Sequence, residues 1–384
     1  MTTKADDLLR DAVRSGEVSG VVAMATASGS PPYVGAFGAR STVNSSRMTP
    51  DTIFQVSALV RPIMAVAGLQ LVDSGVLGLD DPLRTVIPAL NQPLVLTGFD
   101  RNRAPKLRPA RGEITLRRVL NHTAGFNVGS WWDALADLER PWWAPPWAGS
   151  VSLLADPGSR WLHCSDIDLV AMIIERISGL TVSEYLHSEI FRELGMLDTG
   201  FAVGHRSRAR VAGGWRKSDF DAGYANFYSS PKDYFEFVEA VLWGDESLLS
   251  PESFALLCTN QIGALAVPNS LDIRDARTPG EINFYPEIRL HPQATRKWSL
   301  GFMVNTQAVP EGPRAGSLTC AGDADSYCWV DPSARTAGLL FAQPTPYRPD
   351  ATESVFGGFQ RAIYAERESH SRRHRGVVRG PSDD

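Results

Sequence analysis

Segments with strand character lie at both ends of this chain, and segments with helical periodicity fill the middle. The predicted strands are 19–27, with 31–38 as its hairpin partner, and then 297–305, 327–332 and 336–343. The predicted helices are an amphipathic segment within 1–20, then 63–74, 166–179 and a last helix at about 352–367. Strands from both ends with helices between them predict one antiparallel sheet that carries a helical insertion.

Charge and apolar patterning exclude several classes of partner. The 384 residues include 38 Lys and Arg against 43 Asp and Glu, a net charge of −5, which gives no electrostatic reason to expect nucleic acid. Residues 1–20 carry charges throughout, and no apolar run has the length of a membrane span, so we expect a cytoplasmic protein without a membrane partner. The four cysteines lack metal-ligand spacing and are expected to be free thiols, with no cofactor.

Five segments stand in the order of the landmarks of a known family: 48–83, 114–126, 157–179, 190–201 and 316–332. The second, ITLRRVLNHTAGF, is similar to the signature I-x-x-L-L-x-H-T-S-G-L. On these segments the chain resembles the serine β-lactamases and penicillin-recognising esterases. The resemblance implies an α/β (α+β) β-lactamase/transpeptidase-like fold, in which an antiparallel sheet flanked by helices joins a mostly helical domain, with the active site between them.

The resemblance also implies a division of the chain. We expect one catalytic-type domain over 1–367, with an α/β part at about 1–57 and 205–367 and a helical part at about 58–204. The polar, basic residues 368–384 are expected to form a disordered tail.

The nucleophile motif of the family, S-x-x-K, is substituted in this chain. With Phe54 and Pro62 as anchors on either side and no gap between them, the serine position falls on Ala58 and the lysine position on Arg61. An alanine methyl group cannot attack a carbonyl, and arginine stays protonated and cannot act as a base. The spacing therefore predicts that residue 58 cannot form an acyl-enzyme.

The neighbouring Ser57 does not restore the motif by a shift of one residue. Its partner three residues on would be Val60, which has no acid–base chemistry, and one step along a helix turns a side chain by about 100°. Ser57 is explained as a small residue that fills a packing position.

The second and third motifs of the family are also changed. The tyrosine position falls on His163, a residue type suited to proton transfer near neutral pH, although a structural histidine is the alternative. The third motif reads Cys320-Ala321-Gly322, where Cys320 is either a reactive thiol or a small apolar filler. By position, the two backbone amides of the oxyanion hole would be those of Ala58 and Asp323, and backbone donors persist when side chains change.

Two further segments suggest contacts with a substrate. Tryptophans cluster between 131 and 147, where Trp131, Trp132 and Trp143 could form a wall for a flat ligand or could pack in the core. Tyr224 and Asn226 replace a glycine-rich turn of relatives and would narrow one edge of the site.

Three hypotheses for function follow. The favoured one is a non-hydrolytic enzyme of secondary metabolism, in which His163 and Arg61 serve isomerisation, cyclisation, aldol or elimination chemistry on a small carbonyl compound, either aromatic or not. The second is a non-catalytic protein that binds a small molecule or a partner. The third is a residual esterase or amide hydrolase that uses Ser57 or Cys320. The oligomeric state stays open.

Overall fold

A computed structural model gives the architecture of the chain. The residues that it describes are 3–28, 31–41, 46–101, 105–126, 152–162, 167–213, 226–267, 271–272, 281–282, 295–322, 325–343 and 349–377.

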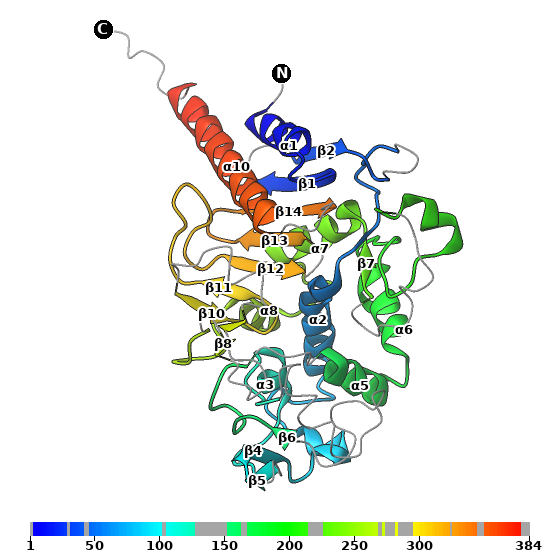
Figure 1. Ribbon diagram of the computed structural model, residues 1–384, viewed down its shortest axis with the longest axis vertical. Coiled ribbons are helices and arrows are strands. Elements are labelled where there is room, and N and C mark those ends of the chain that lie inside the picture. Colours follow the sequence, from blue (N-terminus) through cyan, green and yellow to red (C-terminus); the bar gives the residue numbers. More distant parts are fainter. Residues whose placement is uncertain are drawn as a thin grey trace.

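The centre of the fold is a seven-stranded antiparallel sheet with the strand order β10-β11-β12-β13-β14-β1-β2 (Figure 1). Its strands are β1 Gly20–Ala27, β2 Tyr33–Gly38, β10 Arg296–Trp298, β11 Met303–Asn305, β12 Leu318–Gly322, β13 Ser326–Asp331 and β14 Thr336–Gln343. The N-terminal β1 lies between β2 and the C-terminal β14, with Val22 opposite Phe341. The predicted sheet, built from both ends of the chain around a helical insertion, is confirmed.

Both faces of this sheet are covered, which explains why its strands read as continuous apolar runs. Successive strand residues point to opposite faces. Val21 packs on one side with residues of α1 Lys4–Arg14 and α10 Pro349–Val377, while Val22 packs on the other side with residues of α7 Pro231–Trp243. A sheet buried on both faces needs apolar residues at every position.

The terminal helix α10 extends further than the sequence predicted. It begins at Pro349 and continues to Val377, beyond residue 367, where the disordered tail was expected to begin (Figure 1). Near the middle of α10, the Tyr364 hydroxyl donates to Asp331 Oδ2 at 2.7 Å, which fastens the helix to the end of β13.

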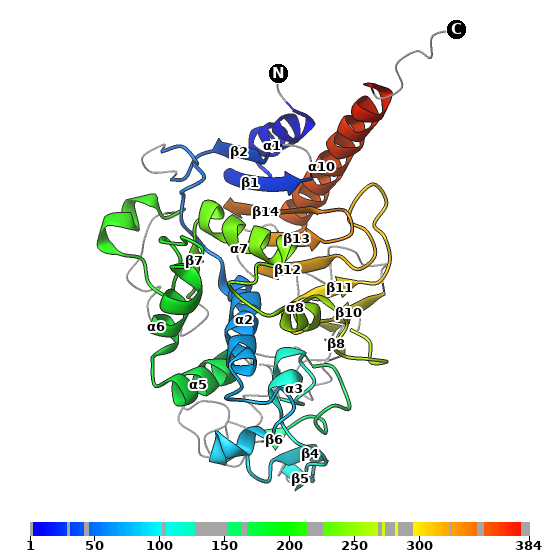
Figure 2. The same cartoon turned by 180° about the vertical axis from the view of Figure 1, so that it is seen from behind.

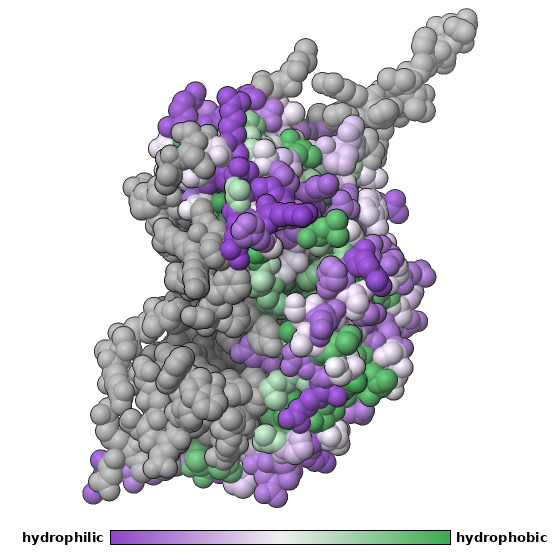
Figure 3. Space-filling model, turned by 90° about the vertical axis from the view of Figure 1, so that its right-hand side faces the viewer, coloured by the Kyte–Doolittle hydropathy of each residue, from purple (hydrophilic) through white to green (hydrophobic). Residues whose placement is uncertain are grey.

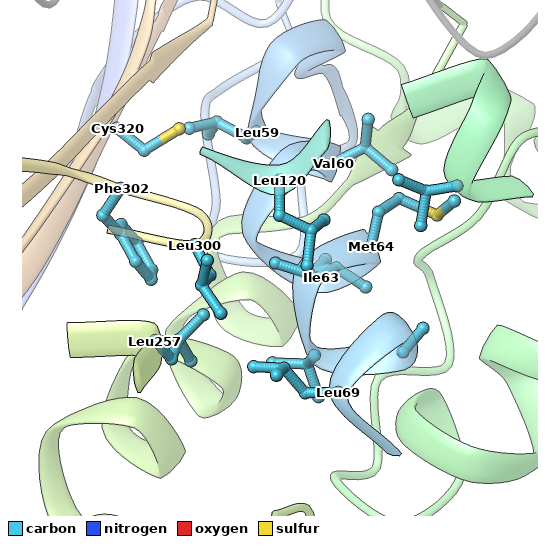
Figure 4. Close-up of a cluster of buried hydrophobic side chains, with 14 of the residues drawn as sticks. Leu59, Val60, Ile63, Met64, Leu69, Leu120, Leu257, Leu300, Phe302 and Cys320 are labelled. Carbon is cyan, nitrogen blue, oxygen red and sulfur yellow. The ribbon is translucent and has the colours of Figure 1, made fainter. Parts of the chain in front are cut away.

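The helical insertion is organised around α2 Val60–Asp73, which connects the sheet to the remaining helices (Figure 2). Ten of its residues are buried, from Val60 to Leu71, so α2 is enclosed on most sides. It packs against α5 Ile167–Ser178 and α8 Pro251–Cys258. Figure 4 shows Ile63 and Met64 of α2 among the buried leucines of neighbouring elements.

Shorter elements make up the rest of the part of the chain that the structure describes. The remaining helices are α3 Leu116–Leu120 and α6 Val182–Leu186, a π-helical turn η5 His187–Phe191, and 3-10 turns η1 Ser57–Leu59, η2 Leu83–Thr85, η3 Pro88–Leu90 and η6 His205–Arg210. The remaining strands are β3 Phe54–Gln55, β4 Leu94–Phe99, β5 Pro105–Pro109, β6 Ser152–Leu153, β7 Tyr228–Ser229, β8 Leu271–Asp272 and β9 Glu281–Ile282.

On the face drawn in Figure 3, hydrophilic side chains alternate with small apolar patches. Large exposed apolar side chains of the described part of the chain come from separate elements: Val34, Val76, Leu107, Leu180, Leu197 and Trp243. No helix within the described ranges has both the length and the hydropathy that crossing a bilayer requires.

Candidate active site

The candidate site is built on the turn η1, through which the chain passes from β3 into α2. β3 pairs with β7, and just beyond it the amides of Val56 and Ser57 both donate to the Phe227 carbonyl, at 2.7 and 3.3 Å. Ser57 then adopts a left-handed backbone conformation, with φ of +40°. A residue other than glycine in this region is strained, at a cost on the order of 1–3 kcal/mol, so the surrounding contacts must hold the turn in place.

The end of β12 approaches this turn closely because residue 322 is a glycine. A Cβ atom placed on Gly322 would lie 2.6 Å from the Val56 carbonyl oxygen, a distance that real Cβ atoms essentially never show. The missing side chain therefore lets the third-motif strand lie directly against the turn that begins α2. The pairing of the Ala58 and Asp323 amides in an oxyanion hole stays a prediction, because Asp323 lies outside the described residues.

The core side of the turn is lined by Cys320 and Tyr234. The Cys320 thiol donates a weak hydrogen bond to the Ala58 carbonyl at 3.9 Å, and Figure 4 shows its sulfur directed from the sheet toward Leu59. The Tyr234 hydroxyl, from α7, donates to the Leu59 carbonyl at 2.8 Å. Burial raises the pKa of Tyr234 well above its ordinary value, so the hydroxyl remains a proton donor.

The opposite edge of the site holds Asn226, which follows directly after residues outside the described ranges. Its side-chain oxygen accepts a hydrogen bond from Gln55 Nε2 at 2.9 Å, and the residue is 4% exposed. The bond ties Asn226, two residues before β7, to the end of β3, two residues before Ser57. Asn226 thus lies beside the strand that leads into η1, and its contact with a substrate stays a prediction.

The structure brings together Ala58, Arg61 and Cys320 from the predicted site. Ala58 is 9% exposed in η1, and Arg61 lies half-buried on the first turn of α2, where its positive charge lowers the pKa of Tyr234 against the larger effect of burial. Cys320 is 1% exposed and packs in the main core, so its thiol faces the underside of the turn. The other predicted site residues lie outside the described residues: Trp131, Trp132, Trp143, His163, Tyr224 and Asp323.

His122 belongs to the second landmark segment, but the sequence analysis gave it no role. It is buried, has a φ of +60°, and packs edge-on against Trp298 and Trp161, with ring centroids 5.0 and 6.0 Å away. Its carbonyl accepts a hydrogen bond from the Leu162 amide at 2.8 Å. Leu162 immediately precedes His163, so this turn anchors the chain that leads to the predicted acid–base residue. The sequence signal was the H-T-A-G run itself.

A metal centre is not part of the described site. Groups of three or more His, Cys, Asp or Glu side chains with an arrangement suited to a metal ion do not occur within the described ranges.

Several known proteins that are similar to this chain over most of its length are acyltransferases. The acyltransferase mokF of Monascus pilosus is 30% identical over 368 residues, covering 84% of this chain and 85% of that protein. Monacolin J acid methylbutanoyltransferase of Aspergillus terreus is 27% identical over 396 residues, covering 93% and 94%. The crystal structure of a mutant of simvastatin synthase (LovD) from Aspergillus terreus superposes with a TM-score of 0.80 at 27% identity, covering 95% of this chain and 97% of that one.

These relatives correct the functional hypotheses. The favoured hypothesis, a non-hydrolytic enzyme for isomerisation, cyclisation, aldol or elimination chemistry, is wrong, and so is the alternative of a non-catalytic binding protein, because proteins similar over more than four-fifths of the chain are acyltransferases. The third hypothesis kept acyl chemistry, but nothing assigns that chemistry to Ser57 or Cys320. The error came from treating the substituted motif residues as evidence about the class of reaction.

A comparison with protein families agrees with the landmark segments and with the fold. The family model described as Beta-lactamase matches residues 5–356, which span both the sheet and the helical insertion. The protein is an enzyme and belongs to the beta-lactamase family.

Proposed function

We propose that the protein transfers a short acyl group from an activated donor, a thioester, to a hydroxyl group of a small molecule in secondary metabolism. The observation that carries the proposal is the similarity to acyltransferases over nearly the whole chain. The relative from Aspergillus terreus is named for a methylbutanoyl group and an acid acceptor, which supports a short branched acyl chain and a hydroxylated acid as the substrates to be tried first.

The transfer is proposed to be direct, without an acyl-enzyme. Ala58 offers no hydroxyl at the start of α2, so the acceptor hydroxyl itself attacks the thioester carbonyl. His163 takes the proton of that hydroxyl as the new C–O bond forms. The tetrahedral intermediate then collapses, the C–S bond breaks, and the leaving thiolate takes the proton back from the imidazolium. Atoms and charges balance, and the enzyme returns to its initial state.

Stabilisation of the negative intermediate is proposed to come from the backbone amides of Ala58 and Asp323, with Arg61 close by. Gly322 brings the end of β12 against η1, which supports the pairing of these two amides. The N-terminus of α2 adds partial positive charge at the same place, and the Arg61 guanidinium adds a full one. Donors fixed in a dry, apolar setting stabilise developing charge more strongly than water does.

The test is a transfer assay with thioesters of short branched acids and a panel of hydroxylated acids. Release of free thiol and formation of the ester are measured together, the second by mass spectrometry. We expect transfer by the wild-type protein, a loss of about 10²–10⁴-fold in His163→Ala, and wild-type rates in the control His205→Ala, whose exposed imidazole lies on η6. Absence of transfer with every donor contradicts the proposed activity.

A separate measurement tests the direct route. The protein is incubated with donor alone, and its intact mass is recorded before acceptor is added. The direct route predicts an unchanged mass, whereas an acyl adduct that disappears on addition of acceptor would show a covalent route and refute the assignment of Ala58.

A further inference from the structure

Two carbonyl groups of η1 are held by side chains that come from distant parts of the sequence. In an α-helix the Ala58 carbonyl would accept from the amide of residue 62, but that residue is Pro62, which has no N–H. The Cys320 thiol donates to this carbonyl instead, beside the Val60 amide. The Tyr234 hydroxyl donates to the next carbonyl, that of Leu59.

Backbone hydrogen bonds provide further contacts that fix the turn. The amides of Val56 and Ser57 donate to Phe227, and the Leu59 amide donates to the Val56 carbonyl at 3.0 Å. The peptide unit between Ala58 and Leu59 is therefore held at its carbonyl by Cys320 and at its N–H by Val56. The unit between Ser57 and Ala58 is held at its carbonyl, which accepts from the Val60 amide. Since a peptide unit is planar, fixing its carbonyl also fixes the direction of the N–H at its other end.

We propose that Tyr234 is a positioning residue of the acyl-transfer site. It holds the carbonyl of the peptide unit between Leu59 and Val60, the N–H of that unit donates to the Ser57 carbonyl, and the unit between Ser57 and Ala58 thereby keeps the Ala58 amide aimed at the intermediate. This inference rests on the proposed function. Tyr234 does not touch the reacting atoms, because its side chain is fully buried beneath the turn. It sets the orientation of the turn, and the Ala58 amide of that turn is the group proposed to contact the intermediate.

The surroundings of Tyr234 suit this role. Its ring packs against Phe237 and Phe341, with centroids 5.6 and 5.7 Å away, so the hydroxyl has little freedom to leave the Leu59 carbonyl. The Cys328 thiol lies beside the same hydroxyl, and Cys328 is the cross-strand neighbour of Cys320. A group with hydrogen bonds and packing on all sides is suited to preorganise a neighbour, and catalysis by an oxyanion hole depends on preorganised donors.

Removal of the Tyr234 hydroxyl should destabilise the transition state more than it destabilises the bound substrate. An amide that is slightly misaligned still allows the neutral thioester to bind, but it stabilises the developing negative charge less well. We therefore expect Tyr234→Phe to lower kcat about 10-fold or more and to leave KM within about twofold of the wild-type value.

The matched control is Tyr364→Phe. This variant also loses a buried hydroxyl that donates a hydrogen bond, at 2.7 Å to Asp331, but on the opposite face of the sheet. We expect a similar loss of thermal stability in both variants and a fall in kcat in Tyr234→Phe alone. Equal kcat in the two variants refutes the positioning role.

A second pair of variants examines the neighbouring donor. Cys320→Ser keeps a hydrogen-bond donor to the Ala58 carbonyl, whereas Cys320→Ala removes it. The inference expects a higher kcat in the serine variant than in the alanine variant. The reverse order would mean that apolar packing, and not the hydrogen bond, is what the turn requires.

Two readouts do not depend on turnover, so a failure of the proposed function is recognised separately. Hydrogen exchange of the amides of residues 56–60 should accelerate in Tyr234→Phe and stay unchanged in Tyr364→Phe. An alkyl phosphonate, which is tetrahedral and anionic, should bind Tyr234→Phe about 10-fold more weakly, while the corresponding neutral carboxamide should bind both proteins equally. Unchanged exchange, or an equal loss of affinity for both ligands, refutes the inference even if no acyl transfer is found.

Discussion

Replacement of Gly322 by alanine tests whether the contact between β12 and η1 matters for activity. A Cβ at this position would lie 2.6 Å from the Val56 carbonyl oxygen, whereas ordinary contacts begin at 3.4 Å. The two backbones must therefore separate by about 3.4 − 2.6 = 0.8 Å to accept the methyl group. The obstacle is a backbone carbonyl, so no side chain can move aside to absorb the change.

The expected magnitude follows from that displacement. A misplacement of about 1 Å in catalytic geometry costs about 10²-fold in rate, so we expect a loss of about 10- to 100-fold in kcat for acyl transfer by Gly322→Ala. Overpacking at a buried site of this kind also costs about 1–3 kcal/mol of stability.

Two other glycines provide controls for the same chemical change. At Gly68, inside α2, the nearest atom to an added Cβ is 3.5 Å away, so Gly68→Ala should keep full activity and gain about 0.5–1 kcal/mol from its helical position. At Gly338 an added Cβ would meet the Trp329 ring at 2.4 Å, away from η1, so Gly338→Ala should lose stability with little change in kcat. Measurement of thermal unfolding and turnover for all three variants separates the two effects. A wild-type kcat in folded Gly322→Ala refutes the geometric argument.

Two further predictions concern chemistry and pH. The double variant Ala58→Ser with Arg61→Lys restores the family's hydroxyl and amine at the start of α2. We expect it to gain weak hydrolysis of nitrophenyl esters and to show an acyl adduct in its mass spectrum. A folded double variant without either would show that the rest of the site no longer supports a covalent route. Hydrogen bonds from Arg108 and from the Arg111 amide hold the pKa of Asp156 at about 2, below the value of about 3.9 in an unfolded chain. Their contribution to stability is therefore present above about pH 4 and is lost as the pH falls toward 2. The difference in unfolding free energy between wild type and Asp156→Asn should therefore shrink below pH 4, and a difference that stays constant down to pH 2 would contradict this.

The sheet and the central helix could be predicted because their signals are local. The apolar runs at 19–27 and 336–343 became the adjacent strands β1 and β14, and the run after Pro62 became α2. Element ends were less predictable: α10 continues to Val377 through a polar, basic segment, although such a composition is typical of a disordered terminus.

The reaction class could not be read from the substituted motif. Ala58 lies on η1 and Arg61 on the first turn of α2. Neither substitution indicated that proteins similar over most of the chain are acyltransferases. A single side chain reports which chemical step is closed to it. It does not report which step replaces it, because that depends on the whole pocket.

By itself, the sequence determined the family fold and the spacing of Ala58 and Arg61. The order of the motifs and the three-residue separation of Ala58 and Arg61 are properties of the chain alone. The tertiary structure alone decided what holds that turn: Tyr234 is 175 residues from Leu59, and Cys320 is 262 residues from Ala58. Such pairs meet only when the sheet closes on α2 and α7. Nothing local in the sequence marks a tyrosine or a cysteine for a carbonyl that far along the chain, so the support of the proposed oxyanion site appears only once the chain is folded.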